Sequence, residues 1–411
     1  MAKSHGEAGL ALVSHGDQSR RILVTSPVST TVADGSRGWH QRRQPHYCQA
    51  LLPSVEKTFS LTQGDVLLGP MATQLGMALG VLFLLPLGDR TERRRMLSLL
   101  ALGMAIACTG VVVAPNFDAL TLSWFGLGIV ALIPSLLPPF LIAFTPEAAQ
   151  GRMLGIVLSG HFSGILLSRT TSGLLAQVWG WRTIYLVSAL AMVAIAVLFR
   201  RCLPALPRTS DENYWALQAS LLSLWRRHHR LRRSCMTQAL LFGSFMSLWS
   251  ALALHLAEAP WRFGPGLIGS FGLVGLASIL AAPLIGRMVD RYGAKRIVVC
   301  GILCSGIGIT LLVLQLGGLW ILGLGLMVLD LGVQGSFLAN QARIYAIDPA
   351  ARSRMSSLLF FSTYLGAASC SLVIAQFWAI WNWGGTCVFA LALVLSALLI
   401  EQNRWRPTAN S

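Results

Sequence analysis

The sequence predicts an all-α polytopic membrane protein made of two repeated helical bundles, and three observations support this fold class. Hydrophobic residues make up 54% of the chain and charged residues only 12%, whereas soluble domains carry about 25% charged residues. Long apolar runs, each near the ~20 residues that cross a bilayer as a helix, follow one another along the chain. Charged and aromatic markers also recur at a fixed distance, as in membrane proteins with duplicated halves.

The first half contains five apolar runs that we expect to span the membrane. The first of them holds 23 residues without a charge, and short basic segments separate several of the later ones. In order, the expected spans are 66–88, 96–115, 119–146, 153–178 and 183–199. A polar, arginine-rich segment follows at 200–234. Within that segment we expect a short surface helix at 214–225.

The second half contains six further runs of the same kind. The expected spans are 235–256, 266–286, 297–316, 319–341, 355–380 and 385–400. The chain therefore divides into a polar N-terminal tail (1–50), an N-terminal bundle (51–199), a central loop (200–234) and a C-terminal bundle (235–411). Eleven spans result, where a symmetric duplication of six predicts twelve.

The repeat shows in markers that share one offset. Asp89 and Asp290 lie 201 residues apart in similar basic segments between apolar runs, and Arg152 and Arg354 lie 202 residues apart. A Trp-x-Trp pair at Trp179 also recurs 202 residues later. Three markers with nearly the same offset indicate duplication of a unit of about 200 residues.

The first span of the first repeat is expected to be missing. Moving 235–256 back by 202 residues places it on 33–54, which contains Asp34, Arg37, His40, Arg42 and Arg43. Such a segment is not expected to form a spanning helix. An altered gene start would explain this, and a protein that evolved eleven spans is the alternative.

Basic residues gather on one side of the predicted membrane. The segments around Arg93 and Lys295, the central loop with its eight arginines and the C-terminal Arg404 and Arg406 all fall on the same side. Arg182 and Arg262 are the basic residues of the connections on the other side, apart from the N-terminal tail. Because short cytoplasmic loops carry an excess of Lys and Arg, we expect the arginine-rich loops and the C-terminus to be cytoplasmic.

Other classes of function find little support in the residues. The net charge of +16 lies in short loops between apolar runs, so a nucleic-acid partner is not expected. Most of the eight cysteines lie inside apolar runs, and no metal site or cofactor is expected. The chain also lacks a nucleophile elbow, a phosphate-binding loop and a zinc-hydrolase motif, so we expect no enzyme.

A loop motif with the pattern Gly-x-x-x-Asp-Arg-x-Gly-x-Lys/Arg-Arg resembles the signature of the major facilitator superfamily. The complete copy is formed by Gly286, Asp290, Arg291, Gly293, Lys295 and Arg296. The earlier copy keeps Asp89, Arg90 and Arg93 but has Leu85 and Glu92 at the two glycine positions. The resemblance covers nearly the whole chain from about residue 51.

Further segments are similar to bacterial inner-membrane members of the drug-efflux-like branch of that family. They are Leu329-Asp330-Leu-Gly332-Val-Gln334 and Asn340-Gln341-Ala-Arg343-Ile344. The resemblance implies a monomeric secondary transporter in the inner membrane, surrounded by the lipid bilayer. It would move a small organic solute by alternating access, coupled to protons. The family's arginine in the fourth span has no counterpart here, since 119–146 carries no charge.

The resemblance also implies that the two loop copies act as gating motifs. Asp290, and Asp89 in the first copy, would accept charge-assisted hydrogen bonds from arginines or helix N-termini when the gate closes. The alternative is that these arginines only anchor the topology.

Polar side chains inside the predicted spans are the candidates for the substrate and proton pathway, because ionisable groups are expensive in a bilayer. Asp330 and Gln334 lie on one stripe of 319–341, and Arg169 and His161 lie in 153–178. Gln74 and Gln238 occupy corresponding positions of two spans. For each, helix–helix hydrogen bonding is the alternative to a role in transport. Two further alternatives for the whole chain are a non-functional relic of a transporter and, more remotely, a membrane-embedded enzyme.

Overall fold

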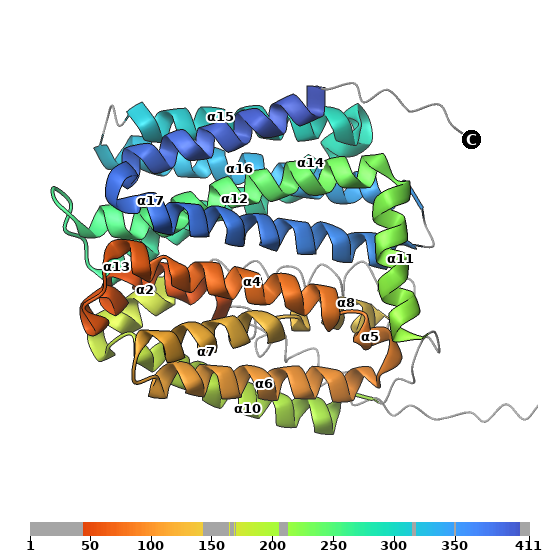
Figure 1. Cartoon of the computed structure of the whole chain (residues 1–411), viewed down its shortest axis with the longest axis horizontal. Helices are drawn as coiled ribbons and strands as arrows, with labels where there is room; N and C mark the ends of the chain where they lie inside the picture. Colours follow the sequence, from red (N-terminus) through yellow and green to blue (C-terminus); the bar gives the residue numbers. More distant parts are fainter. Residues whose placement is uncertain are drawn as a thin grey trace, which may run out of the picture.

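The computed structural model describes residues 44–142, 164, 168, 170–204, 213–314, 318–348 and 351–402. Across these residues the fold is all-α and contains no strand, which confirms the predicted fold class. Long helices run nearly side by side in two stacks, one from each half of the chain (Figure 1). Helix α11 lies across one end of both stacks, and α2 and α13 lie at the opposite end. We refer to these as the α11 end and the α13 end.

In the described residues of the N-terminal stack, 170–179 are helical, and six long or medium helices and two short ones have assigned bounds. They are α2 (Gln44–Phe59), α3 (Gln63–Val66), α4 (Leu68–Phe83), α5 (Leu87–Arg90), α6 (Arg93–Val113), α7 (Phe117–Val130), α8 (Ile133–Ile142) and α10 (Arg182–Cys202).

The C-terminal stack follows the crossing helix α11 (Tyr214–Arg227). It consists of α12 (His229–Ala257), α13 (Pro265–Ser270), the 3-10 turn η2 (Phe271–Gly275), α14 (Leu276–Tyr292), α15 (Ala294–Leu314), α16 (Gly318–Tyr345) and α17 (Arg352–Gln402). The surface helix expected at 214–225 is therefore present as α11.

Nine helices of the described residues are long and apolar enough to cross a membrane. One of these, α17, contains both of the last two expected spans. Its chain reverses at Asn382, where φ is 48° and ψ is −153°. The expected span 153–178 lies mostly outside the described residues, and of it 170–178 is helical. The remaining expected spans each correspond to helices of the structure.

Helix α2 differs from the sequence-based expectation. Residues 33–54 were expected not to form a spanning helix, and α2 is not among the helices long enough to cross a membrane; however, 44–54 are helical and form most of α2, where no helix was predicted. The helix also crosses the boundary drawn at residue 50. Leu51, Leu52 and Val55 are fully buried, and α2 packs against α4, α7, α12 and α13. An apolar face of about two turns is enough to hold a helix against its neighbours, even where the preceding residues are charged.

Helices within the N-terminal stack approach one another closely through glycine. A Cβ added to Gly76 of α4 would lie 2.2 Å from the backbone oxygen of Phe125, and one added to Gly128 of α7 would lie 2.2 Å from that of Thr73. Backbones of α4 and α7 therefore touch directly at these two positions. Small residues allow this contact, which is a main source of helix association in lipid.

Helix α11 connects the two stacks at their shared end. The Tyr214 hydroxyl donates to the carbonyl oxygen of Phe83 at 3.1 Å, and the Gln218 amide donates to that of Leu82 at 2.9 Å. These carbonyls belong to the last turn of α4, where no intrahelical donor remains. Further along, Leu221 is buried against Leu231 and other residues of the C-terminal stack.

Candidate functional site

A buried polar cluster lies where α2 and α4 of the N-terminal stack meet α12 of the C-terminal stack. The amide nitrogens of Gln49 and Gln74 both approach the Met246 sulfur at 3.3 Å, and that of Gln49 also lies 3.5 Å from the Ser250 hydroxyl. Gln74 and Gln49 are 2% and 3% exposed. Side chains from both halves of the chain therefore share one buried position.

The side-chain oxygen of Gln74 is buried and has no hydrogen-bond partner among the described residues. Leaving a buried acceptor unpaired costs about 1–3 kcal/mol, so such groups are uncommon in folded proteins. A donor from a bound solute would satisfy this oxygen.

A continuous row of aromatic rings leads through the C-terminal stack beside this cluster. Neighbouring ring centroids lie 5.5–6.2 Å apart along the series Phe337, Phe360, Tyr364, Phe242, Phe245 and Trp249. The row joins α16, α17 and α12. Trp249 ends it one turn from the Met246 of the polar cluster. Aromatic faces offer apolar and cation–π contacts to a planar or amphipathic ligand.

Of the other in-membrane candidates, Asp330 and Gln334 lie on α16 and Gln238 lies on α12. Asp330 is 5% exposed, so its carboxyl group lies inside the bundle. Gln334, one turn further, is half-buried. His161 and Arg169 lie outside the part of the chain that the structure describes.

The second predicted glutamine, Gln238, belongs to a different network. Its side-chain oxygen accepts from Asn340 at 3.3 Å, and the Asn340 oxygen accepts from the Arg343 guanidinium at 2.6 Å. Both amide side chains are fully buried. Gln238 and Gln74 therefore belong to different networks and do not form one paired site.

The network of Gln238 ends in a buried ionic cluster around Glu401, which the sequence analysis did not single out. Arg343 donates to both carboxylate oxygens of Glu401, at 2.8 and 3.0 Å. Arg233 lies 3.2 Å from the carboxylate, and Thr237 donates to it at 3.0 Å. The Glu401 side chain is fully buried. The cluster joins the first turns of α12, the last turn of α16 and the end of α17.

The complete loop motif lies at the junction of α14 and α15. Gly293 ends α14 with φ at +86°, a left-handed conformation that favours glycine. Asp290 is exposed and has no ion pair with any residue that the structure describes. Gly286 borders open space, and the Arg291 guanidinium lies over the Tyr292 ring. Lys295 and Arg296 are exposed in the first turn of α15.

The incomplete copy lies between α4 and α6. Asp89 and Arg90 belong to the short helix α5, and Arg93 begins α6. Glu92, at the second glycine position, forms an ion pair with Arg94 at 3.0 Å. At the motif position where the complete copy has the helix-ending Gly293, this copy therefore has Glu92, whose carboxylate pairs with the nearby Arg94.

The two stacks are also joined at the α13 end. Gln63 of α3 accepts a hydrogen bond from the Trp378 indole of α17 at 2.6 Å and donates one to Glu258, which follows α12, at 2.6 Å. Nearby, burial and the negative charge of Glu258 raise the pKa of Glu56, while Lys57 lowers it. Contacts from α3 and α17 thus hold the stacks together on this side.

A hollow of about 650 Å³ opens beside these contacts. It is lined by residues of α2 and of the α12–α13 connection, among them Lys57, Glu258 and Arg262. No group of three or more metal-binding side chains occurs in the described part of the chain.

Two bundles of membrane-length helices that share a buried polar cluster define a polytopic membrane transporter. Comparison with known proteins gives the family. A family model described as the Major Facilitator Superfamily matches residues 49–258 and 234–408. The chain belongs to this superfamily, and it is a secondary transporter.

The relatives agree with this assignment. The chain is 33% identical over 392 residues to "Uncharacterized transporter YgaY" of Escherichia coli O157:H7, covering 93% of this chain and 95% of the relative. It is 25% identical over 373 residues to "Inner membrane transport protein YnfM" of Escherichia coli K12, covering 86% and 85%. Among solved structures, a mutant form of the nucleoside transporter NupG superposes with a TM-score of 0.75 at 13% identity, covering 92% of this chain and 100% of that one.

Proposed function

We propose that this transporter moves a small organic solute through a site at Gln74, coupled to protons, and belongs to the drug-efflux-like branch. The observation that carries the proposal is the buried, unpaired oxygen of Gln74 at the contact between the two stacks. In alternating access the site lies at the interface of the two repeats. Gln49 and Met246 contribute from the two sides.

The aromatic row supports a solute with an apolar or aromatic surface. The six neighbouring rings supply aromatic faces that such a solute would contact once the two bundles part. The remaining polar candidates of the pathway are Asp330, Gln334, Gln238, Arg169 and His161. Asp330 is the candidate proton carrier, because it is a buried ionisable side chain within a spanning helix, and such groups tend to be functional.

Alternating access requires that the contacts at the two ends break in turn. At the α13 end these are the hydrogen bonds of Gln63, and at the α11 end those of Tyr214 and Gln218. We propose that the N-terminal bundle (51–199) and the C-terminal bundle (235–411) move as two bodies about the loop 200–234. The loop motifs at Asp89 and Asp290 would then form their gating contacts in only part of the cycle.

Shifting α2 by 202 residues lays it over 246–261, the last turns of α12 and the residues after it. We propose that α2 stands in the position of the first span and that its 16 residues supply only part of it. We further propose that the protein acts as a monomer in the inner membrane.

Replacing Gln74 with leucine should lower transport without lowering stability. Leucine has a similar volume and removes the unpaired oxygen, so the folded state keeps its packing and loses a buried polar group. Loss of one hydrogen bond to the solute should reduce transport efficiency roughly tenfold. The measurement is proton-driven transport of candidate organic solutes in proteoliposomes, paired with thermal unfolding.

The matched control is Gln402→Leu, which makes the same change at an exposed position. If the Gln74 variant transports every tested solute as well as the original chain, the site is wrong. A joint fall of transport and stability would indicate a structural role for Gln74.

The α11 end is expected to face the cytoplasm, because the arginines of the central loop gather there. In a variant without native cysteines, a cysteine at the exposed Ser223 should react with a membrane-impermeant maleimide only after permeabilisation. A cysteine at the exposed Gly264, near the α13 end, should react in intact cells. The reverse pattern would invert the orientation.

A further inference from the structure

The outward face of α11 carries side chains that are unusual for a helix in contact with water alone. Trp215 is 72% exposed and Leu222 is 51% exposed, and Arg226 follows on the same side of the helix. The exposed Arg227 lies about 100° further round the helix. The adjacent side, about a quarter turn round the helix, holds Leu221 and the hydrogen-bonding Tyr214 and Gln218, so it is the one that binds the two stacks. The exposed face is therefore fixed outward.

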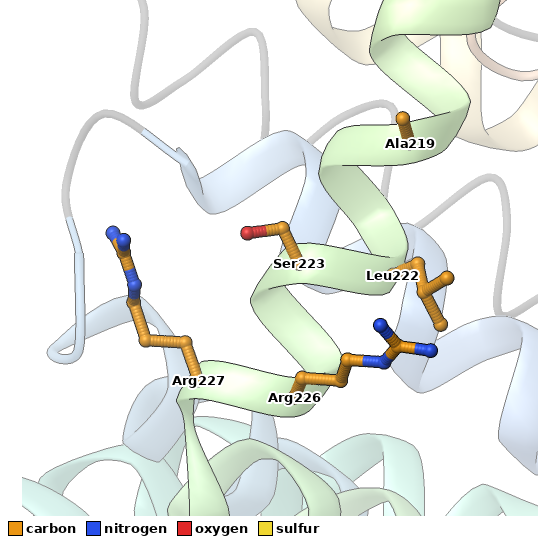
Figure 2. A pocket seen from close by; sticks show the side chains of 5 residues that line it. All are labelled: Ala219, Leu222, Ser223, Arg226 and Arg227. Carbon is orange, nitrogen blue, oxygen red and sulfur yellow. The ribbon is translucent and has the colours of Figure 1, made fainter.

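Arg226 and Arg227 border a hollow of about 500 Å³ that Ala219, Leu222 and Ser223 complete. Figure 2 shows the Arg227 guanidinium extending on the side of Ser223 and that of Arg226 on the side of Leu222. Neither guanidinium forms an ion pair with a carboxylate in the ranges that the structure describes. Two positive charges thus border the hollow, one on each side.

The backbone at this end of the helix has its own partner. The Arg232 guanidinium donates to the carbonyl oxygens of Trp225 at 3.1 Å and Arg226 at 2.7 Å. Terminal carbonyls are therefore satisfied, and the side chains of Arg226 and Arg227 are not needed to cap α11.

We propose that this face of α11 binds the headgroups of anionic phospholipids. The helix lies across the ends of the spanning helices, where α4 ends at Phe83 and α12 begins at His229. That level corresponds to the lipid headgroups of a surrounding bilayer. Arginine pairs with phosphate through two parallel hydrogen bonds, and tryptophan and leucine insert among headgroups and upper acyl chains.

A lipid fits this face better than a soluble phosphate compound does. A free phosphate would pair with a guanidinium group but would leave Trp215 and Leu222 in water. A membrane-anchored headgroup satisfies the charge and covers the apolar side chains together. Each Lys or Arg close to an anionic lipid surface strengthens binding to that surface roughly fivefold.

The test measures lipid binding to the full chain in neutral detergent by native mass spectrometry. The probes are dioleoylphosphatidylglycerol, which is anionic, and dioleoylphosphatidylcholine, which has no net charge. The double variant Arg226→Gln and Arg227→Gln should weaken binding of the anionic lipid roughly fivefold for each arginine removed. Binding of the neutral lipid should stay unchanged. Thermal unfolding should match that of the original chain.

The matched control is Arg200→Gln with Arg201→Gln, which removes two exposed arginines at the end of α10. Its binding of the anionic lipid should fall clearly less. An equal loss in both double variants would overturn the site, because it would show only an effect of total charge. The proposed lipid site would also be overturned if the α11 variant bound the anionic lipid as well as the original chain did, or if inorganic phosphate at equal concentration displaced the lipid.

Discussion

Replacing Glu401 with glutamine should destabilise the protein by about 3 kcal/mol, although the residue lies close to the end of the last helix. The carboxylate is fully buried and is shared by Arg343 and Arg233, whose side chains are 14% and 22% exposed. Glutamine keeps the shape and removes the charge. Two guanidinium groups would then remain without a counter-ion, which is the costly way to break a buried ion pair.

The measurement is thermal unfolding in detergent, followed by intrinsic tryptophan fluorescence. Asp118→Asn is the control, because it makes the same chemical change at an exposed position in the first turn of α7 and should cost only a few tenths of a kcal/mol. Adding Arg343→Gln to the Glu401 variant should restore part of the loss, since it removes one of the stranded charges. If the Glu401 and Asp118 variants unfold at the same temperature, the cluster contributes no stability.

Replacing Gly128 with alanine should cost about 3 kcal/mol, the upper part of the range for overpacking. Its Cβ would lie 2.2 Å from the Thr73 oxygen and 2.8 Å from the Met77 nitrogen. Both are backbone atoms of α4, so the helices have to separate, and no side chain can move aside. The yield of folded protein and its unfolding midpoint should both fall.

Gly126→Ala on the same helix is the control. Its Cβ would lie 3.8 Å from that of Ala107, an ordinary contact. Because alanine has the higher helix propensity in both variants, any difference between them reports the contact of α7 with α4. Equal stability of the two variants would contradict the proposed backbone packing.

The spans could be predicted from the sequence because uncharged runs of about 20 residues have few other stable solutions. The boundaries of α12 and α16 were less predictable. Each continues into a charged segment, since Arg233 and Arg343 lie on helical turns and reach one counter-ion. Helix α2 was not predicted because the charged residues in 33–43 ruled out a spanning helix over 33–54. The second part of that segment nevertheless carries an apolar face, which is buried in the structure.

The candidate site could be predicted only in part. Gln74 stood out as a polar residue in an apolar run, and the structure places it against the opposite stack. Its neighbours Gln49 and Met246 did not, because one lay in the presumed tail and the other has an apolar side chain. The contacts of Gln74 and Gln49 with Met246 join residues at least 172 positions apart. They depend on how the two stacks dock, which no local sequence pattern predicts. Glu401 was missed for the same reason, since its partners come from two other helices.

The way α11 joins the two stacks sets a limit on how far they can separate. A tether without structure would stretch to several times its resting length, whereas a helix of 14 residues has a fixed length of about 21 Å. Its first turns are hydrogen-bonded to the end of α4, and its later turns pack against the C-terminal stack. The stacks can therefore pivot about its two ends, but the distance between those ends stays nearly constant. While these hydrogen bonds hold, opening at this end is a hinge movement about a rigid connection, and wider separation requires the bonds of Tyr214 and Gln218 to α4 to break.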